Sequence, residues 1–425
     1  MLIDTTLLVN NPEIIKGLLD GSMQRYGSVI RWAAGTENAG QIVRHLAETP
    51  GLTHKLIDGV NPIGNGLNYQ KLIGIEKTLS SAMGLTQIAA GASVLNLGVS
   101  IAGFAYMGYK LHQIQKNLGH IQQSMEAGFN RIEADLYRID RNIEVGFNKV
   151  GASLNRIDNR LDIISGQLSY LYLLVEDNRQ KQQSLAKAIS HIQQAMIIQE
   201  IAALNAEIND RQRFPNQSPR ECLKVANRVR LFLANQALQI SPQLDAELML
   251  STDIAIQGWA IATATEANLL LEIGQNQEAY ELLVQEVPKF QQVAQRWGNE
   301  LINDENSYLS TAYRFTNSRF QNHITPERVE RIIEISPSDY RLSPEEIRQK
   351  KTDVDVEFEM SHNSQWDETW INRQVAIAEY LDTLSELSAR LDSLQSFAAL
   401  CEARNINSQD LLPDSDVEEG LYVLA

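Results

Sequence analysis

Cysteine is scarce in this sequence. Among 425 residues only Cys222 and Cys401 are cysteines, and they lie far apart without a CxxC partner. This spacing argues against a disulfide framework and against a cysteine zinc site, and it fits a reducing compartment. The first residues also lack a basic stretch followed by an apolar one, so we expect no secretory signal and a chain that is cytoplasmic as synthesised.

Motifs of catalysis are also missing. The sequence has no Walker loop, no HExxH and no GxSxG, and its seven histidines are scattered. His112 and His120 share one side of an expected helix without an acidic or cysteine ligand, which favours a surface role over metal binding. We therefore expect no enzymatic activity, no cofactor and no metal site.

Basic residues are fewer than acidic ones, and this imbalance is confined to the C-terminal half of the chain. The formal net charge is −16, yet residues 1–214 are nearly balanced, whereas residues 215–425 hold 17 basic against 34 acidic side chains. An acidic half repels phosphate backbones, which argues against a nucleic-acid partner. We expect this half to stay in water and to offer a surface for a protein partner, while the near-neutral half can approach a membrane.

One segment lacks charge altogether. Between Lys77 and Lys110 lie 32 residues without a charged side chain. As a helix, Ile88–Tyr109 would span about 33 Å, close to the roughly 30 Å hydrocarbon core of a bilayer. Its composition is rich in glycine and alanine, so insertion into lipid is only marginally favourable, and a permanently buried helix is an equal alternative. The residues expected to contact a membrane are Ile88, Val94, Leu95, Leu97, Val99, Ile101, Phe104 and Met107.

A long helical stripe follows this segment. From Leu111 to Leu168 apolar residues recur at steps of three and four, and the pattern of Glu126–Asp140 returns eighteen residues later at Glu144–Asp158. Eighteen residues with five apolar steps give a period of 3.6, which predicts a nearly straight helix that associates along one face. The residues expected to mediate this association are Phe129, Ile132, Leu136, Ile139, Ile143, Phe147, Val150, Leu154 and Ile157.

The N-terminal unit has mixed signals. Leu2–Val9 and Gly27–Trp32 resemble strands, Pro12 marks the first position of a helix after Asn11, and Gly40–Glu48 is expected to form another short helix.

The C-terminal half is expected to be helical over residues 219–300 and again over Trp366–Arg404, where the apolar spacing is amphipathic. Between them, the alternation of Val354–Glu359 suggests an exposed strand. Its acidic face has the chemistry to recruit a divalent cation, but a solvated strand edge is the favoured interpretation.

These patterns predict a mainly α fold, an elongated helical bundle with long coiled-coil-like helices and a small mixed α/β N-terminal unit. The expected units are a mixed N-terminal unit, a charge-free helical segment, a long helical hairpin, a helical region, an irregular acidic insert, and a C-terminal helix with an acidic tail, over residues 1–70, 71–110, 111–214, 215–302, 303–365 and 366–425.

The charge-free segment followed by long amphipathic helices resembles, in layout, the α-helical pore-forming toxins of the cytolysin A type. The resemblance covers Thr78 to about Gln212. It implies a soluble monomer that refolds and oligomerises in a membrane, with the lipid bilayer as a conditional partner. The mixed N-terminal unit and the acidic C-terminal residues depart from that layout. The alternative is a soluble coiled-coil scaffold or adaptor, with the charge-free segment permanently buried and a protein-binding C-terminal half.

Overall fold

A computed structural model gives the fold. It describes residues 6–9, 12–48, 86–89, 218–320, 324, 326–360, 368–408 and 421–423, with positions 200, 203–204, 206–207, 210 and 214. The protein is mainly helical, with a small N-terminal antiparallel sheet of three strands, which confirms the expected fold class at that level. The long hairpin expected over residues 111–214 lies almost entirely outside the described residues.

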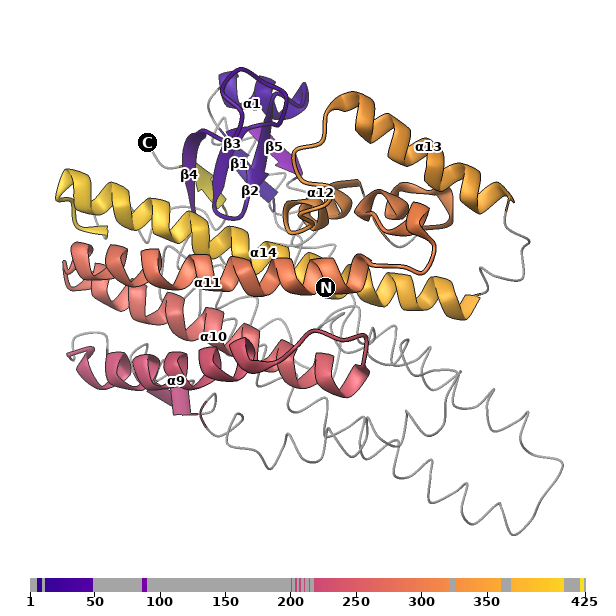
Figure 1. Cartoon of the computed structure of the whole chain (residues 1–425). Helices are drawn as coiled ribbons and strands as arrows, with labels where there is room; N and C mark the ends of the chain where they lie inside the picture. Colours follow the sequence, from indigo (N-terminus) through magenta and orange to yellow (C-terminus); the bar gives the residue numbers. More distant parts are fainter. Residues whose placement is uncertain are drawn as a thin grey trace, which may run out of the picture.

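Four long helices form the body of the described fold. They lie side by side in the order α9, α10, α11 and α14, and each packs on the next (Figure 1). Their bounds are Arg220–Gln239 for α9, Ala246–Glu272 for α10, Asn276–Ile302 for α11 and Glu368–Arg404 for α14. The helices expected over residues 219–300 and after Trp366 are therefore confirmed.

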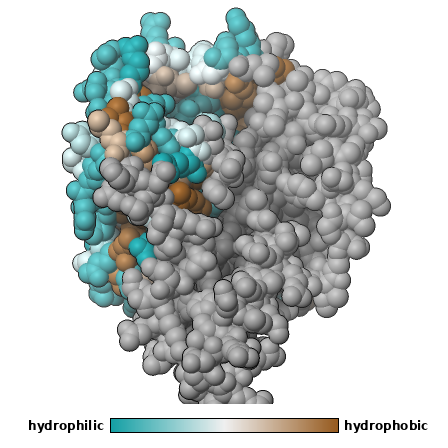
Figure 2. All heavy atoms as spheres, turned by 90° about the vertical axis from the view of Figure 1, so that its right-hand side faces the viewer, coloured by the Kyte–Doolittle hydropathy of each residue, from teal (hydrophilic) through white to brown (hydrophobic). Residues whose placement is uncertain are grey.

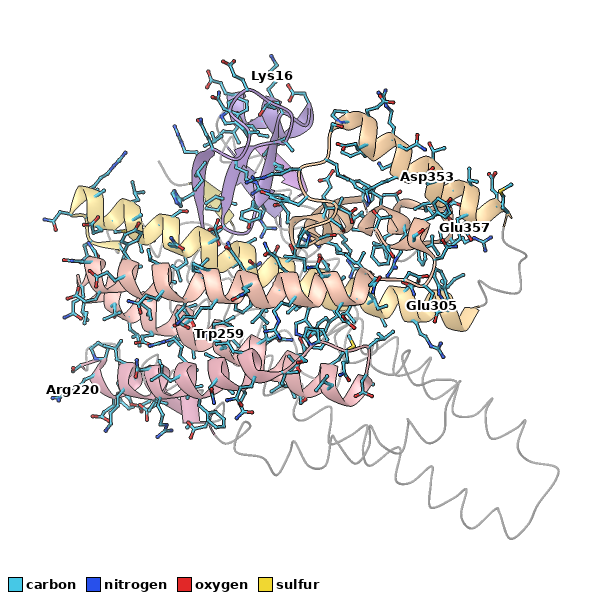
Figure 3. All side chains as sticks on the ribbon, in the orientation of Figure 1. Lys16, Arg220, Trp259, Glu305, Asp353 and Glu357 are labelled. Atoms are coloured by element: carbon cyan, nitrogen blue, oxygen red, sulfur yellow. The ribbon has the colours of Figure 1, made fainter. Side chains whose placement is uncertain are left out.

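A tight turn sets α10 against α11. Gly274 has φ +78° and follows the end of α10, where its N–H donates to the carbonyl of Leu271. Glycine adopts this left-handed conformation without a steric penalty, so it ends α10 and reverses the chain. Trp259 of α10 is completely buried against Phe290 of α11, with ring centroids 5.2 Å apart (Figure 3, where Trp259 lies within the helical layers). Trp297 of α11 is completely buried too, and its ring centroid lies 5.1 Å from that of Tyr380 of α14.

Buried polar side chains connect three of these helices. Arg230 of α9 forms ion pairs with Glu266 of α10 at 2.7 Å and with Glu286 of α11 at 3.2 Å. Glu286 also accepts a hydrogen bond of 2.8 Å from Nε1 of Trp259. Because each charged group has partners, this network is compatible with burial and fixes the register of the helices.

The sheet packs over α14. Its strand order is β2-β3-β4-β6-β1-β5, in which β1 and β6 are parallel and the other neighbours are antiparallel. The N-terminal three-stranded part is formed by β2, β3 and β4, and α1 lies beside it (Figure 1). The bounds are Thr6–Val9 for β1, Pro12–Leu19 for α1, Met23–Tyr26 for β2, Val29–Trp32 for β3, Ile42–Glu48 for β4, Thr86–Ala89 for β5 and Leu421–Val423 for β6. The start of α1 at Pro12 and the strand before Trp32 agree with the sequence patterns.

Two expected helices are strands where the structure describes them. Residues 42–48 form β4, which pairs antiparallel with β3 and with β6, so both edges of this strand are hydrogen-bonded. Thr86–Ala89, inside the charge-free segment, forms β5 and pairs antiparallel with β1. In both places pairing with strands distant in the sequence overrides the local helical pattern.

The segment between α11 and α14 is not an irregular insert. It contains three short 3-10 helices and two α-helices, Pro326–Glu334 (α12) and Pro344–Met360 (α13). The expected strand at Val354–Glu359 is wrong because Val354 and Phe358, four residues apart, bury the same face of α13. Phe358 lies against Phe320 and Trp370, with ring centroids 6.2 and 5.9 Å away.

The last helix is more deeply buried than its amphipathic pattern predicts. Every residue from Tyr380 to Leu391 is buried, including the charged side chains Asp382, Glu386 and Arg390. The reason is that α14 is covered on several sides at once, by α10, α11, α12 and β2. Its polar face therefore contacts other protein groups instead of water.

The described surface is mixed in polarity. On the face seen in Figure 2, hydrophobic side chains of the described residues form separate spots among hydrophilic ones. Within the described part of the chain, no helix combines the length and the hydropathy that a bilayer span requires. Both cysteines are buried, and neither forms a disulfide bond.

Candidate functional site

A polar pocket lies where the sheet meets the helical body. Its volume is about 270 Å³, slightly below the range of roughly 300–1,000 Å³ that is usual for small-molecule sites. Residues from β2, β3, α11, α14 and the end of α12 surround it, namely Tyr26, Arg31, Gln291, Gln295, Glu334, Ile335, Tyr340, Ser385, Ser388 and Asp392.

The β2–β3 turn places the strand residues of the pocket on α14. Gly27 has φ +54°, and its α-carbon approaches the backbone of Ala389 closely. The N–H of Ser28 donates to Oγ of Ser393 at 3.1 Å, and this hydroxyl in turn donates to the carbonyl of Ala389 at 2.7 Å. The hairpin is therefore fixed on α14 by a close backbone approach and by one serine.

We expect Gly27→Ala to weaken this contact. A β-carbon at position 27 would lie 2.5 Å from the carbonyl oxygen of Ala389, which is backbone and cannot move aside easily. The free energy of unfolding should fall by about 2–3 kcal/mol, since overpacking alone costs about 1–3 kcal/mol. Urea unfolding of purified protein measures the change.

Gly35→Ala is the matched control. Gly35 also has a positive φ, +89°, but nothing lies within 4 Å of the position that a β-carbon would take there. This variant carries the backbone penalty of about 1 kcal/mol without the clash. Equal losses in the two variants would contradict a close contact between the hairpin and α14.

Arg31 is the cation of the pocket. Its guanidinium forms an ion pair with Glu334 of α12, and its Cζ lies 3.7 Å from the centroid of the Tyr26 ring. Stacking on the ring and pairing with the carboxylate hold the guanidinium in one orientation. Nη2 of Arg31 is thereby occupied by the protein itself, whereas its Nε is buried without a hydrogen-bond partner among the described residues.

Two carboxyl groups face this cation. Burial raises the pKa of Glu334, although Arg31 opposes the shift, and the nearby charge of Asp392 raises it further. Burial likewise raises the pKa of Asp392, again against the effect of Arg31. Burial, together with the charges of Asp392 and Glu334, also raises the pKa of Tyr26. Carboxyl groups with raised pKa values in a concave site are typical of functional positions.

A network of ion pairs surrounds the pocket along α14. The carboxylate of Asp382 accepts hydrogen bonds from Nε of Arg331 at 2.5 Å and from Nε of Arg328 at 2.9 Å, and both arginines belong to α12. The carboxylate of Glu386 forms an ion pair with Nη2 of Arg25 in β2 at 3.2 Å. These pairs connect the sheet and α12 to the same helix, so the walls of the pocket are held together by α14.

None of the pocket-lining residues is among the site residues predicted from the sequence. Of the positions expected to contact a membrane, the structure describes only Ile88, which lies opposite Leu7 in the β1–β5 pair. Val94, Leu95, Leu97, Val99, Ile101, Phe104 and Met107 lie outside the described residues, as do all nine positions expected to mediate helix association. Those expectations therefore stay predictions.

The pocket residues are absent from the sequence-based predictions. Only the ion pairs beside the pocket had a sequence signal, since Asp382, Glu386 and Arg390 follow one another at steps of four within the otherwise largely apolar α14. The acidic residues of α13 do not form a metal site with one another. Asp353 and Glu357 point outward from this helix (Figure 3), and no cluster of three metal-ligating side chains occurs among the described residues.

Comparison with known proteins gives no relative. The chain matches no family model, no curated protein and no solved structure.

Proposed function

We propose that this chain is a conditional membrane-acting protein. In this proposal it inserts its charge-free segment into a bilayer and self-associates through its long helices, as a pore-forming or membrane-disrupting effector would. It is made in the cytoplasm and joins a membrane only when triggered. The observation that carries the proposal is the run of 32 residues without charge between Lys77 and Lys110.

The attachment of β5 supports a segment that can be released. Thr86–Ala89 stands at the end of the strand order and pairs over four residues with β1. Backbone hydrogen bonds contribute about 0.5–1.5 kcal/mol each, so detaching such a short strand costs only a few kcal/mol. The bilayer would have to supply that amount.

The helical body supports the same division of roles. Trp259 and Trp297 are fully buried between long helices, and the ion pairs of Arg230 join α9, α10 and α11. These contacts do not involve β5, so the body can keep its fold when the strand leaves the sheet. A stable body and a short, weakly held strand within the charge-free segment are compatible with conditional insertion.

The test is leakage of dye from liposomes. The wild-type protein, mixed with dye-loaded vesicles over a range of pH values, should release the dye and float with the lipid. Leu97→Glu places a carboxylate in the middle of the charge-free segment. A charge there opposes insertion by roughly 3 kcal/mol, so leakage should fall about 100-fold.

Leu231→Glu serves as the control. Leu231 lies on α9 with 56% of its surface exposed, so a carboxylate there stays in water. Its leakage should equal that of the wild type. Absence of leakage and flotation in the wild type would overturn the proposal. If instead Leu97→Glu fails to fold while Leu231→Glu folds, the segment is a permanent core helix and the scaffold alternative holds.

A further inference from the structure

We propose that the polar pocket binds a small organic cation, such as a primary amine with further hydrogen-bonding groups. This inference is independent of membrane action. It rests on the charge of the pocket, on side chains that lack partners, and on its size.

The charges of the pocket favour a cation. Arg31 is paired with Glu334 and stacked on Tyr26. The carboxylate of Asp392 accepts no hydrogen bond from the described residues, and the charge that acts on it is that of Arg31. The charged residues that line the pocket are one guanidinium and two carboxylates, so the lining has a formal charge of −1. A phosphate or carboxylate ligand would be repelled, whereas an ammonium group would neutralise Asp392.

A buried hydroxyl group supports a ligand at this place. Ser388 is only 4% exposed and lines the pocket. Its Oγ has no hydrogen-bond partner among the described residues. Ser385, one turn earlier on α14, donates instead to the carbonyl of Arg331. Nε of Arg31, which also lines the pocket, is buried without a hydrogen-bond partner among the described residues. Buried polar groups are usually hydrogen-bonded, and an acceptor group on the ligand would satisfy this one.

The remaining walls define the ligand further. Gln291 and Gln295 of α11 bring amide groups that both donate and accept hydrogen bonds. Tyr340, with 42% of its surface exposed, lies beside them. A volume of about 270 Å³ corresponds to roughly nine water molecules at about 30 Å³ each. The ligand is therefore a small molecule of about that many heavy atoms, with an amine at Asp392 and polar groups along its length.

Calorimetric titration of the full chain tests the proposal. The probes are 1,4-diaminobutane, neutral 1,4-butanediol and anionic succinate, which share a four-carbon chain and differ in charge. We expect saturable binding of one diamine per chain, and no saturable binding of the diol or of succinate. Absence of saturable diamine binding, or equal or tighter binding of the diol or succinate, would overturn the inference.

Two variants locate the binding. Asp392→Asn should weaken diamine binding at least tenfold, and Glu402→Gln should leave it unchanged, since Glu402 is an exposed carboxylate on the same helix. Ser388→Ala, which removes one hydroxyl group, should weaken binding about three- to tenfold. Circular dichroism confirms that each variant is folded. Binding that is unaffected by both pocket variants, or equally reduced by Glu402→Gln, would show that the diamine binds elsewhere and would refute the proposed site.

Discussion

Replacing Arg314 by methionine should lower the free energy of unfolding by about 3–5 kcal/mol, the range for removing one partner from a buried charged contact. Arg314 is 1% exposed. Its guanidinium donates to the carbonyls of Ile302 and Leu309, both at 2.9 Å, and to that of Leu301 at 3.1 Å. Two of these carbonyls belong to the last turn of α11.

The expected loss of stability is large because Arg314 pairs the carbonyl groups at the end of α11. The last carbonyls of α11 have no partners within the helix, and here a buried side chain supplies them. Burial lowers the pKa of Arg314 to about 10 against the opposing effect of Asp304 and Asp339, so the guanidinium is charged at neutral pH. Methionine fills similar space but donates no hydrogen bond, and each buried carbonyl left unsatisfied costs about 1–3 kcal/mol.

Urea unfolding followed by circular dichroism measures this change. Arg348→Met is the control, because Arg348 is 73% exposed and pairs only with Glu345 one turn away on α13. An exposed pair of this kind contributes at most about 0.5 kcal/mol. A loss for Arg314→Met no larger than for Arg348→Met would contradict the role of Arg314 at the end of α11.

Local signals predicted the elements that local forces determine. Pro12 begins α1 as its position suggested. The long helices around residues 219–300 follow from their apolar periodicity. These elements could be predicted because each carries its own start signal or repeating apolar face.

The start of α13 also carries a local helix signal in the sequence. Ser343, Pro344 and Glu346 form a helix start, because the N–H of Ser343 donates to Glu346 at 2.8 Å and the N–H of Glu346 donates back to Ser343. The alternation of charges in Val354–Glu359 was a weaker indicator than this reciprocal cap. Buried Val354 and Phe358 then determine the face of the helix.

The pocket could not be predicted from the sequence because its residues come from distant parts of the chain. Arg31 and Glu334 are 303 residues apart, and Arg25 and Glu386 are 361 apart. A single sequence shows which charges exist but not which of them pair across such distances. The same limit applies to β4 and β5, whose strand partners lie elsewhere in the chain. Non-local pairing, not local propensity, determines these parts of the molecule.

The charged face of α14 leads to the second large effect, expected for Glu386→Gln. Glu386 is 2% exposed. Its carboxylate accepts hydrogen bonds from Nε of Arg390 at 2.8 Å and from Nη2 of Arg25 at 3.2 Å. Neutralising it leaves two buried guanidinium groups without their carboxylate, so the free energy of unfolding at pH 7 should fall by about 3–5 kcal/mol. Glu345→Gln, at an exposed carboxylate on α13, should change it by at most about 0.5 kcal/mol.

The pH dependence distinguishes this effect from a simple loss of packing. Burial alone would raise the pKa of Glu386, but Arg390, Arg25 and Arg331 outweigh it and lower the pKa from 4.5 to about 2. The unfolded chain therefore binds a proton first as the pH falls. The stability that Glu386 contributes is complete above pH 4.5 and is lost progressively towards pH 2.

The pKa values of the two pocket carboxyl groups shift in the opposite direction to that of Glu386. Because the pKa values of Glu334 and Asp392 are raised in the folded protein, the folded state binds their protons first, and mild acidification favours the fold. We expect unfolding measurements at a series of pH values to show stability that is kept or gained above pH 4.5 and lost below it. In Glu386→Gln the loss below pH 4.5 should be smaller, so the two stability curves converge towards pH 2. A constant difference between wild type and variant over this window would contradict the charge pairing of Glu386 and would assign the effect of the substitution to packing alone.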